Sequence, residues 1–429
     1  MFISKISLEN VRGFGRLDFD LSRPGATEAG WTVFTGDNGS GKSTLLKAIA
    51  IGLMGKDAAR ALQPSFNRWI REGAHEAFVK LDIVRQPDDD QMTERGKGPR
   101  SPFPAWIVLK NGGREVSIEP TAPPAKKESQ TAQRSIWANN ARGWFSCGYG
   151  PLRRVFGASS DATRQMVAPT TERFVTMFQE AASLGEVDKW LQSLHHKALE
   201  GKLDEKRQLD VLLEILRDEL TPAEIQVDGV DSDGLWLKDR NGVRLPWADM
   251  SDGYRSALAL LTDILRHLMN AYGVEGLTEK DERGKLFVNR TGVILIDEVD
   301  AHLHPEWQQK IGFWLKRHFP KIQFLVTSHS PIICQAADLN GLFVLPAPGS
   351  EEKPRALTRE EYWEIIASRS DTILLTAAFG LEHTRSERAV RERNNYAALM
   401  AKKRSGASLT NAEQKVADQL KPFALNGDE

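Results

Sequence analysis

Residues 36–43, GDNGSGKS, match the pattern GxxxxGK[ST], which binds nucleotide phosphates. The backbone N–H groups of such a loop point at phosphate oxygens, and the helix that follows adds a favourable dipole. Lys42 would contact the β- and γ-phosphates, and the Ser43 hydroxyl would bind Mg²⁺. An apolar run at 31–35 precedes the loop and a helical pattern at 44–54 follows it. The segment therefore predicts a nucleotide-phosphate site in the context that the motif requires.

A pair of carboxylates follows a second apolar run. The strand predicted over residues 293–296 ends in Asp297 and Glu298, where strand ends deliver side chains to a ligand crevice. Asp297 would hold the metal through water, and Glu298 would polarise the water that attacks the γ-phosphate. The alternative is a surface Asp-Glu pair after a core strand. Because the pair and the phosphate loop support each other, they predict an ATP or GTP hydrolase.

A third segment, MSDGYR at residues 250–255, opens a long helical pattern that runs to Tyr272. Ser251, the N–H of Gly253 and the helix dipole could bind a phosphate, although the segment has no lysine. Taken alone, Ser-Asp-Gly before a helix is usually only an N-cap. Its place upstream of Asp297, together with His329 after a strand at 324–327, favours the phosphate-binding interpretation.

Together these motifs resemble the ABC-type ATPases, specifically their SMC/RecF-like branch. The resemblance covers most of residues 1–345 and rests on ISLENVRGF, GDNGSGKS, MSDGYRS, VILIDE, VDAHLHPEWQ and LVTSHSP. It implies a P-loop ATPase head that binds ATP and Mg²⁺ and dimerises head to tail over two ATP molecules. In such a dimer each composite site joins the phosphate loop of one copy to the 250–255 segment of the other.

The resemblance also implies roles for individual residues. Glu298 would be the general base, His329 would contact the γ-phosphate, and Asp300 would communicate across the dimer. Ser43 and Asp297 would hold the metal. The implied ATP-binding residues are Arg12, Gly36, Asp37, Asn38, Gly39, Ser40, Gly41, Lys42, Ser43 and Thr44, and the signature residues acting in trans are Ser251, Asp252, Gly253 and Tyr254.

Two features depart from the usual pattern of this branch. The signature has Met250, Asp252 and Tyr254 where Leu, Gly and Gln are commonest, and an acidic Asp252 near a γ-phosphate is expected to weaken closure. The glutamine that usually links Mg²⁺ to the helical lobe has no clear counterpart, and Gln133 is one candidate.

The segment GYGPLRR at residues 148–154 resembles a Tyr-Gly-Pro-x-Arg element of ATPase subunits from bacterial anti-phage systems of the Septu and retron-associated types. The phrases MFQEAASLGEVDKWLQSLHHKAL and ILLTAAFGLEHTRSE are similar to the same group. A turn carrying a solvated arginine pair explains residues 149–154 equally well, and both interpretations stay open here.

The elements that must position these residues follow from periodicity. Alternation on both sides of residues 12–14 predicts an antiparallel hairpin at the N-terminus, and Asn-Gly turns at 111–113 and 241–242 predict two more. The wholly apolar runs at 293–296 and 324–326 predict parallel strands, and residues 173–220 predict amphipathic helices. These patterns predict an α/β head whose mixed sheet has central parallel strands and an N-terminal antiparallel layer, with a helical lobe insertion and no long coiled coil.

The predicted domain organisation has four parts. Residues 1–172 form an N-terminal ATPase lobe, 173–220 a helical insertion, 221–345 a C-terminal ATPase lobe, and 346–429 a charged helical extension. The chain has 57 Lys and Arg against 58 Asp and Glu, so its net charge of -1 provides no global field that would attract nucleic acid. Two cysteines cannot form a disulfide framework, and no apolar run could span a bilayer. We therefore expect a soluble, cytoplasmic protein.

Residues 385–404 are locally basic and suggest a partner. The basic residues there are Arg385, Arg388, Arg391, Arg393, Lys402, Lys403 and Arg404. The segment could be a solvated face, could contact DNA phosphates or could dock a protein, and the apolar face of Tyr396, Leu399 and Met400 favours docking.

The resemblance thus predicts the sensor or regulatory ATPase subunit of an anti-phage defence system, acting as a homodimer with a separate nuclease or toxin effector of HNH or Toprim type. The alternatives are a RecF-type DNA-repair ATPase, which would bind DNA, and a transporter's nucleotide-binding subunit, which is disfavoured by ISLENVRGF. A scaffold that holds ATP without hydrolysis is disfavoured by Glu298.

Overall fold

The structure is a computed structural model of the chain. It describes residues 1–23, 25, 28–93, 98–99, 102–120, 126–138, 140–153, 169–180, 182–218 and 225–425. Contacts divide the chain into two compact units, Met1–Ser368 and Arg369–Glu429. The four-part organisation expected from the sequence stays a prediction.

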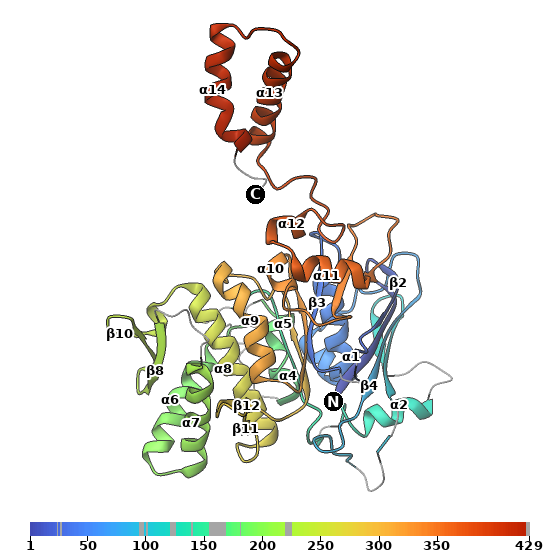
Figure 1. Ribbon diagram of the computed structural model, residues 1–429. Coiled ribbons are helices and arrows are strands. Elements are labelled where there is room, and N and C mark those ends of the chain that lie inside the picture. Colours follow the sequence, from blue (N-terminus) through green and yellow to red (C-terminus); the bar gives the residue numbers. More distant parts are fainter. Residues whose placement is uncertain are drawn as a thin grey trace. The chain divides into compact units, whose positions relative to one another are not determined.

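A five-stranded antiparallel sheet with the order β2-β1-β4-β5-β6 opens the first unit (Figure 1). Its strands are β1 (Phe2–Val11), β2 (Phe14–Asp20), β4 (Glu76–Val84), β5 (Phe103–Asn111) and β6 (Val116–Glu119). In β1, Ile6 and Leu8 are buried whereas Glu9 is exposed, since successive side chains face opposite sides of a sheet. The predicted hairpins at residues 12–14 and 111–113 are both present.

The central sheet has six strands in the order β16-β15-β3-β14-β13-β7. Its strands are β3 (Gly30–Gly36), β7 (Ser146–Tyr149), β13 (Gly292–Ile296), β14 (Ile322–Thr327), β15 (Leu342–Leu345) and β16 (Arg355–Ala356). The five strands from β15 to β7 are parallel, and β16 is antiparallel to β15. Every residue of β13 and β14 is buried, as apolar parallel strands require. The carboxyl ends of β3, β13 and β14 therefore lie side by side.

Helix α1 (Lys42–Leu62) lies between the two sheets and contacts β4 and β5 on one side and β3, β13 and β14 on the other (Figure 1). The rings of Phe19, Phe34 and Phe343 pack together in this core, with centroids 4.5–5.9 Å apart. Helix α9 (Pro305–His318) contacts β3 and the short α10 (Pro331–Cys334). The predicted fold, with parallel strands at the centre and an antiparallel N-terminal layer, is confirmed.

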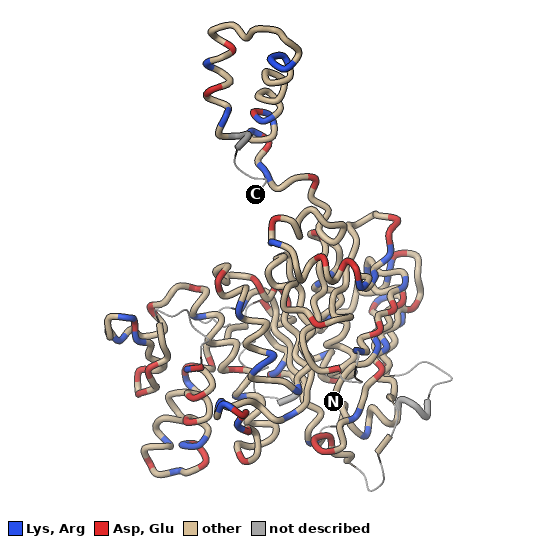
Figure 2. Tube along the Cα trace, viewed as in Figure 1, with Lys and Arg blue, Asp and Glu red and all other residues tan. Residues whose placement is uncertain are grey.

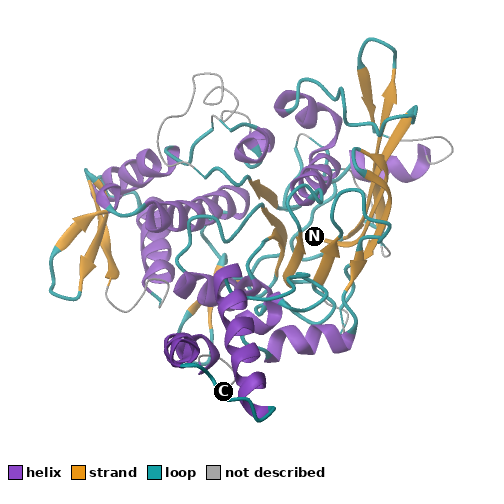
Figure 3. Cartoon of the chain, turned by 90° about the horizontal axis from the view of Figure 1, so that it is seen from above, coloured by secondary structure: helices purple, strands orange, loops and turns teal. Residues whose placement is uncertain are grey.

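A helical lobe is formed by α6 (Glu186–Leu199) and α7 (Leu203–Arg217), which pack against each other and against α8 (Asp252–Tyr272). They also pack against a three-stranded sheet of β8 (Ile225–Asp231), β9 (Gly234–Asp239) and β10 (Arg244–Pro246). Figure 3 shows this lobe and the antiparallel sheet on opposite sides of the parallel strands. Within the described residues the longest helices, α1 and α8, have 21 residues each, so this part of the chain has no coiled-coil arm.

The remaining elements of the first unit are α2 (Lys126–Gln133), α4 (Pro169–Glu172), α5 (Val175–Phe178), the 3-10 turn η1 (Trp247–Asp249), β11 (Thr278–Lys280), β12 (Leu286–Val288) and α11 (Arg359–Ala367). The second unit contains α12 (Ser370–Leu374), α13 (Glu387–Arg404) and α14 (Asn411–Leu425). Acidic and basic residues are interspersed along both units (Figure 2). Among the described helices, none combines the length and apolar character needed to cross a membrane.

Candidate active site

The phosphate loop (residues 36–43) joins the end of β3 to the first turn of α1. Gly36 and Gly41 have φ of 144° and 96°, conformations that only glycine adopts without strain. A Cβ on Gly36 would lie 2.1 Å from the backbone oxygen of Leu345, and a Cβ on Gly41 would lie 2.6 Å from the ring of Phe14. The path of the loop thus requires glycine at both positions.

Lys42 is buried and lies inside this loop. Its Nζ donates hydrogen bonds of 2.8 Å to the backbone oxygens of Gly36 and Asp37. Burial lowers the pKa of Lys42, and the nearby carboxylates of Asp297 and Glu298 oppose that shift. The predicted lysine therefore lies beside the predicted acidic pair. At the tip of the loop, the exposed residues are Asp37, Asn38 and Gly39, while Ser40 is buried.

Arg12, which the resemblance places among the ATP-binding residues, lies beside the start of α1. Its guanidinium lies 4.3 Å from the centroid of the Trp69 ring and donates a 3.4 Å hydrogen bond to Oγ1 of Thr44. Ser43 and Thr44 are both half-buried in the first turn of that helix. Two predicted phosphate-contacting elements, the loop and Arg12, therefore meet at one place.

A cavity of about 720 Å³ opens beside the phosphate loop. Its lining includes Phe14, Arg16, Gly39, Gly41, Arg71 and Pro348. One wall of the cavity is glycine backbone, and the other walls carry an aromatic ring and two arginines. Such a lining suits a ligand with an apolar ring that bears polar groups.

Asp297 and Glu298 begin a turn at the end of β13, which we call the acidic turn (residues 297–302). Oγ1 of Thr327 donates a 2.6 Å hydrogen bond to Oδ1 of Asp297 and accepts one of 2.7 Å from the backbone N–H of Glu298. Thr327 ends the neighbouring strand β14, so two adjacent strand ends fix the acidic pair.

The donor set at this edge fits a Mg²⁺ ion. Oδ2 of Asp297 is buried and has no hydrogen-bond partner among the described residues. A buried carboxylate oxygen without a partner is costly unless a cation or water satisfies it, and Mg²⁺ prefers such oxygens. Asp297 and the hydroxyl of Ser43 are the residues that would hold the ion. No cluster of three or more His, Cys, Asp or Glu side chains suited to a metal occurs in the described part of the chain.

His329 follows β14 and faces the same region. Burial and the positive charge of Lys42 lower the pKa of His329, while Asp300, Glu298 and Asp37 act in the opposite direction. These electrostatic effects place the imidazole near the phosphate loop and the acidic turn. Because its pKa lies below the ordinary value, the ring is neutral at pH 7 and can donate one N–H.

The signature segment (residues 250–255) forms the start of α8, with Ser251 at the N-cap. Ser251 and Asp252 are exposed, and the Asp252 carboxylate pairs with Arg255. A Cβ on Gly253 would lie 2.4 Å from the backbone oxygen of His302 in the acidic turn, so this position requires glycine. The ring of Tyr254 packs edge-on against Trp307. The acidic Asp252 is thus partly neutralised within its own helix.

The structure does not bring Gln133 to this edge. Gln133 is exposed on α2, which contacts β5 of the antiparallel sheet. The strand next to β13 is β7, and α5 packs against it. Glu180, just after α5, is close enough to Lys47 of α1 to raise the pKa of that lysine, although burial lowers it overall. The segment that follows α5 therefore lies beside α1.

Sequence reasoning did not single out Thr327 and did not decide the role of Arg153. Thr327 was part of the LVTSHSP motif, and its position two residues before His329 was the available signal. Arg153 is buried, and its guanidinium contacts the backbone of the acidic turn. The GYGPLRR segment was its only signal, and a strand end followed by two arginines does not reveal that Arg153 turns inward.

Comparison with family models matches residues 5–221 to a family described as "AAA domain", and residues 172–335 to one described as "AAA domain, putative AbiEii toxin, Type IV TA system". The first match covers half of the chain. Between them the two matches include the phosphate loop, the signature segment, the acidic turn and His329.

Among curated proteins, the chain is 26% identical over 337 residues to Septu protein PtuA of Bacillus mycoides (strain KBAB4), which is 77% of this chain and 38% of that protein. It is 40% identical over 111 residues to the Retron Ec83 probable ATPase of Escherichia coli, 25% of this chain and 18% of that protein. It is 30% identical over 154 residues to DNA replication and repair protein RecF of Mesorhizobium japonicum (strain LMG 29417 / CECT 9101 / MAFF 303099), 36% of each. The chain spans well under half the length of these relatives. The predicted resemblance to RecF-like and defence ATPases is confirmed.

Proposed function

The chain belongs to the AAA domain family, and from that premise we propose that it binds ATP with Mg²⁺ and hydrolyses it in a head-to-tail dimer. One observation carries this proposal. Lys42, His329, Asp297 and Glu298 lie at one edge of the parallel sheet. There Oδ2 of Asp297 is buried and has no hydrogen-bond partner in the part of the chain that the structure describes. Phosphate binding, metal binding and general base catalysis all require such an arrangement.

ATP enters by replacing contacts that the phosphate loop makes with itself. The Nζ of Lys42 exchanges the backbone oxygens of Gly36 and Asp37 for the β- and γ-phosphate oxygens. The N–H groups of the loop and the α1 dipole stabilise the same charge. The base and ribose occupy the 720 Å³ cavity between the loop and the β1–β2 hairpin. Because the cavity adjoins Gly39 and Gly41, the phosphates can reach the loop from it.

Hydrolysis depends on the acidic turn. The carboxylate of Glu298 accepts the proton of the attacking water, and the neutral imidazole of His329 donates its N–H to the γ-phosphate. Thr327 keeps the backbone of Glu298 and the carboxylate of Asp297 in fixed relation. Mg²⁺ held by Ser43 and Asp297 would neutralise the phosphate charge.

The second copy completes each site with its own signature segment. Ser251 is exposed at the N-terminus of α8, where the helix dipole favours an anion. This segment provides no lysine, so it can only supplement a phosphate loop. Asp300, in the acidic turn, is placed next to Lys42 and His329, which suits communication between the two copies.

Complementation between two inactive variants tests the composite site. Ser251→Arg and Lys42→Ala subunits should each be inactive alone, because every homodimer lacks one half of both sites. When they are mixed in equal amounts, random pairing gives about half mixed dimers with one intact site each, so about a quarter of wild-type activity should return. Mixed dimers demonstrated by differently tagged copies but without activity would indicate a self-contained hydrolase.

We further propose that this ATPase is the sensor or regulatory subunit of an anti-phage defence system with a separate nuclease or toxin effector of HNH or Toprim type. The likeness to Septu protein PtuA and to a retron ATPase supports this role. A cytoplasmic location is part of the same proposal.

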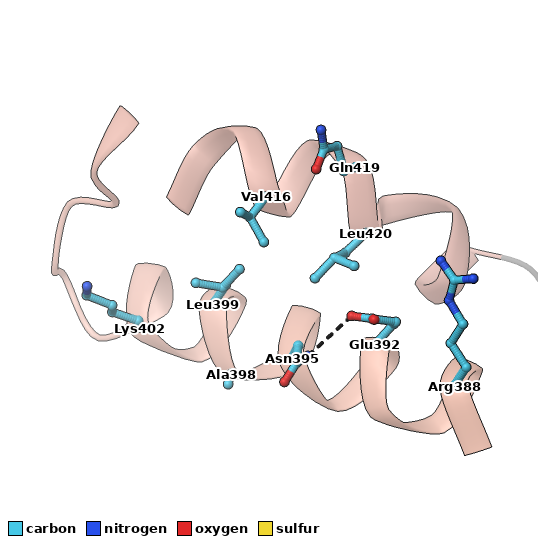
Figure 4. Close-up of a pocket in the computed structure, with 9 residues that line it drawn as sticks. All are labelled: Arg388, Glu392, Asn395, Ala398, Leu399, Lys402, Val416, Gln419 and Leu420. Carbon is cyan, nitrogen blue, oxygen red and sulfur yellow. Dashed lines mark hydrogen bonds between the residues drawn. The ribbon is translucent and has the colours of Figure 1, made fainter. Parts of the chain in front are cut away.

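The effector docks on the second unit. Helices α13 and α14 form a hairpin in which Leu399 faces Val416 and Leu420 (Figure 4), and Lys402 pairs with Glu413 at 2.6 Å. No residue of α13 is buried. A cavity of about 750 Å³ lies between the helices. A hairpin that buries so little of its own surface leaves exposed area on which a partner protein can pack. Leu399 is not part of that area, because it packs between the two helices.

The RecF relative favours one other candidate, a DNA-repair ATPase. That function requires binding to gapped duplex DNA by the isolated protein. Tight, salt-dependent binding to such DNA, with no capture of a co-encoded effector, would support repair over defence.

A further inference from the structure

Arg153 is 3% exposed, although it lies in a segment that follows the end of β7. The interpretation of residues 149–154 as a turn with a solvated arginine pair is therefore wrong for Arg153, and Arg154 lies outside the described residues. Burying a guanidinium is costly unless its N–H groups are satisfied. The partners of Arg153 consequently show what this residue is for.

The guanidinium of Arg153 holds the backbone of the acidic turn. Its two terminal nitrogens donate hydrogen bonds to the backbone oxygens of Asp297 at 2.8 Å and Glu298 at 3.0 Å. Longer contacts of 3.3–3.5 Å reach the backbone oxygens of Gly150, Val299 and Ala301. A planar fork of donors on separate nitrogens suits several converging carbonyls, whereas a lysine ammonium carries its three N–H groups on one nitrogen.

The charge of Arg153 also belongs to this arrangement. Burial lowers the pKa of Arg153 to about 10, and the carboxylates of Asp297, Asp300 and Glu298 work against that decrease. The side chain is thus a cation at neutral pH, next to three acidic residues. It partly neutralises the turn while no carboxylate pairs directly with its guanidinium among the contacts above.

The turn needs such support because its backbone is strained. Glu298 has a φ of 46°, in the left-handed region that non-glycine residues rarely adopt. Residues persist there only when their surroundings over-determine them. Thr327 holds the N–H of Glu298 and Arg153 holds its carbonyl, so the peptide groups on both sides of the Glu298 Cα are fixed.

Arg153 is also tied to the signature helix α8. The hydroxyl of Ser256 donates a 3.3 Å hydrogen bond to the backbone oxygen of Arg153. A few residues earlier, the Tyr149 hydroxyl donates to Oδ2 of Asp263 at 3.0 Å, and Asp263 is itself paired with Arg266 on the same helix. The segment from Tyr149 to Arg153 is therefore attached to α8 at two points and to the acidic turn at its end.

We propose that Arg153 is a positioning residue that aligns the general base Glu298 with the signature helix. This inference rests on the proposed ATPase function. Arg153 touches only backbone atoms of the turn and acts on the reaction through Glu298. Its loss lets the Glu298 peptide relax from the left-handed conformation, so turnover decreases while the phosphate loop still binds ATP.

The test compares Arg153→Lys with Arg23→Lys in the full chain. Arg23 is the matched control because it is also a buried arginine, with 8% of its surface exposed. It donates hydrogen bonds to Thr32 and Asp338 near the end of β3 that lies away from the phosphate loop. A small displacement of a catalytic group costs roughly 100-fold in rate, so we expect kcat of Arg153→Lys to decrease by about that factor with KM within about threefold of wild type. Arg23→Lys should lower the melting temperature without this loss of kcat.

Two further variants keep the inference open to refutation. Guanidinium chloride at low millimolar concentration should restore part of the kcat of Arg153→Ala and none of Glu298→Gln. If neither Arg153 variant folds, Ser256→Ala decides, because it should lower kcat several-fold at unchanged KM. If Arg153→Lys folds and keeps the kcat of wild type, the inference is overturned. If no Arg153 variant folds, a wild-type kcat in Ser256→Ala overturns it. A wild-type protein that hydrolyses no ATP would overturn the proposed function instead.

Discussion

Thr327→Val is the most informative single substitution near the acidic turn. Valine has nearly the same shape as threonine and favours strands, so β14 should keep its packing. The change removes the hydroxyl that donates to Oδ1 of Asp297 at 2.6 Å and accepts from the N–H of Glu298 at 2.7 Å. It thereby leaves two buried polar groups without partners.

The expected size follows from those two bonds. An unsatisfied buried donor or acceptor costs about 1–3 kcal/mol, so losing partners for two such groups should decrease the free energy of unfolding by about 2–6 kcal/mol. If misplacement of Glu298 raises the activation free energy of hydrolysis by about 1.4 kcal/mol, kcat should decrease about tenfold. KM should change little, since the phosphate loop is untouched.

Thr35→Val is the matched control. Thr35 is buried in the neighbouring strand β3, and its hydroxyl has no hydrogen-bond partner among the described residues. Replacing it should be neutral or slightly stabilising, because an unsatisfied polar atom is removed. Urea unfolding and steady-state ATPase assays measure both variants. Equal stability of the two variants, together with unchanged kcat in Thr327→Val, would refute the role of this hydroxyl.

Two other predictions concern residues outside the catalytic machinery. Burial holds the pKa of His318 below its ordinary 6.5, so the unfolded chain binds a proton that the folded chain does not, and stability should fall as the pH drops through 6.5. The unfolding free energy of His318→Gln, measured from about pH 7 to about pH 5, should depend less on pH than that of wild type, and an equal slope would contradict this. Truncation after Thr384 removes α13 and α14 and should abolish pull-down of a co-encoded effector. Undiminished capture would refute docking on the second unit.

The sequence predicted the elements that carry strong local patterns. The β1–β2 hairpin, the loop between β3 and α1, and the buried strands β13 and β14 lie where alternation, glycine spacing and apolar runs indicated. Local patterns could not predict contacts between distant segments. The bonds from Arg153 to Glu298 and from Thr327 to Asp297 depend on β7, β13 and β14 becoming neighbours.

The remaining expectations concerned helix surfaces, which are ambiguous in sequence. Gln133 was proposed as the metal-linking residue only because it is a glutamine, and its helix α2 packs on the antiparallel sheet. Leu399 was grouped with Tyr396 and Met400 as a docking face, yet it packs toward α14, a helix that the charge pattern alone did not separate from α13. The positions of the phosphate loop and the acidic pair were nevertheless predictable, because their residue types are few and their spacing is specific. Their catalytic roles stay predictions.

The central claim is that Lys42 binds the phosphates and Glu298 is the base, and ATP binding and hydrolysis measured on the same preparations test it most directly. We predict that Lys42→Ala loses Mg²⁺-dependent ATP binding, whereas Glu298→Gln binds ATP as wild type does and turns it over at least about 100-fold more slowly. Removing a base leaves the phosphate contacts in place, so the two variants should separate binding from chemistry. Equal hydrolysis rates for wild type and Glu298→Gln would contradict the account.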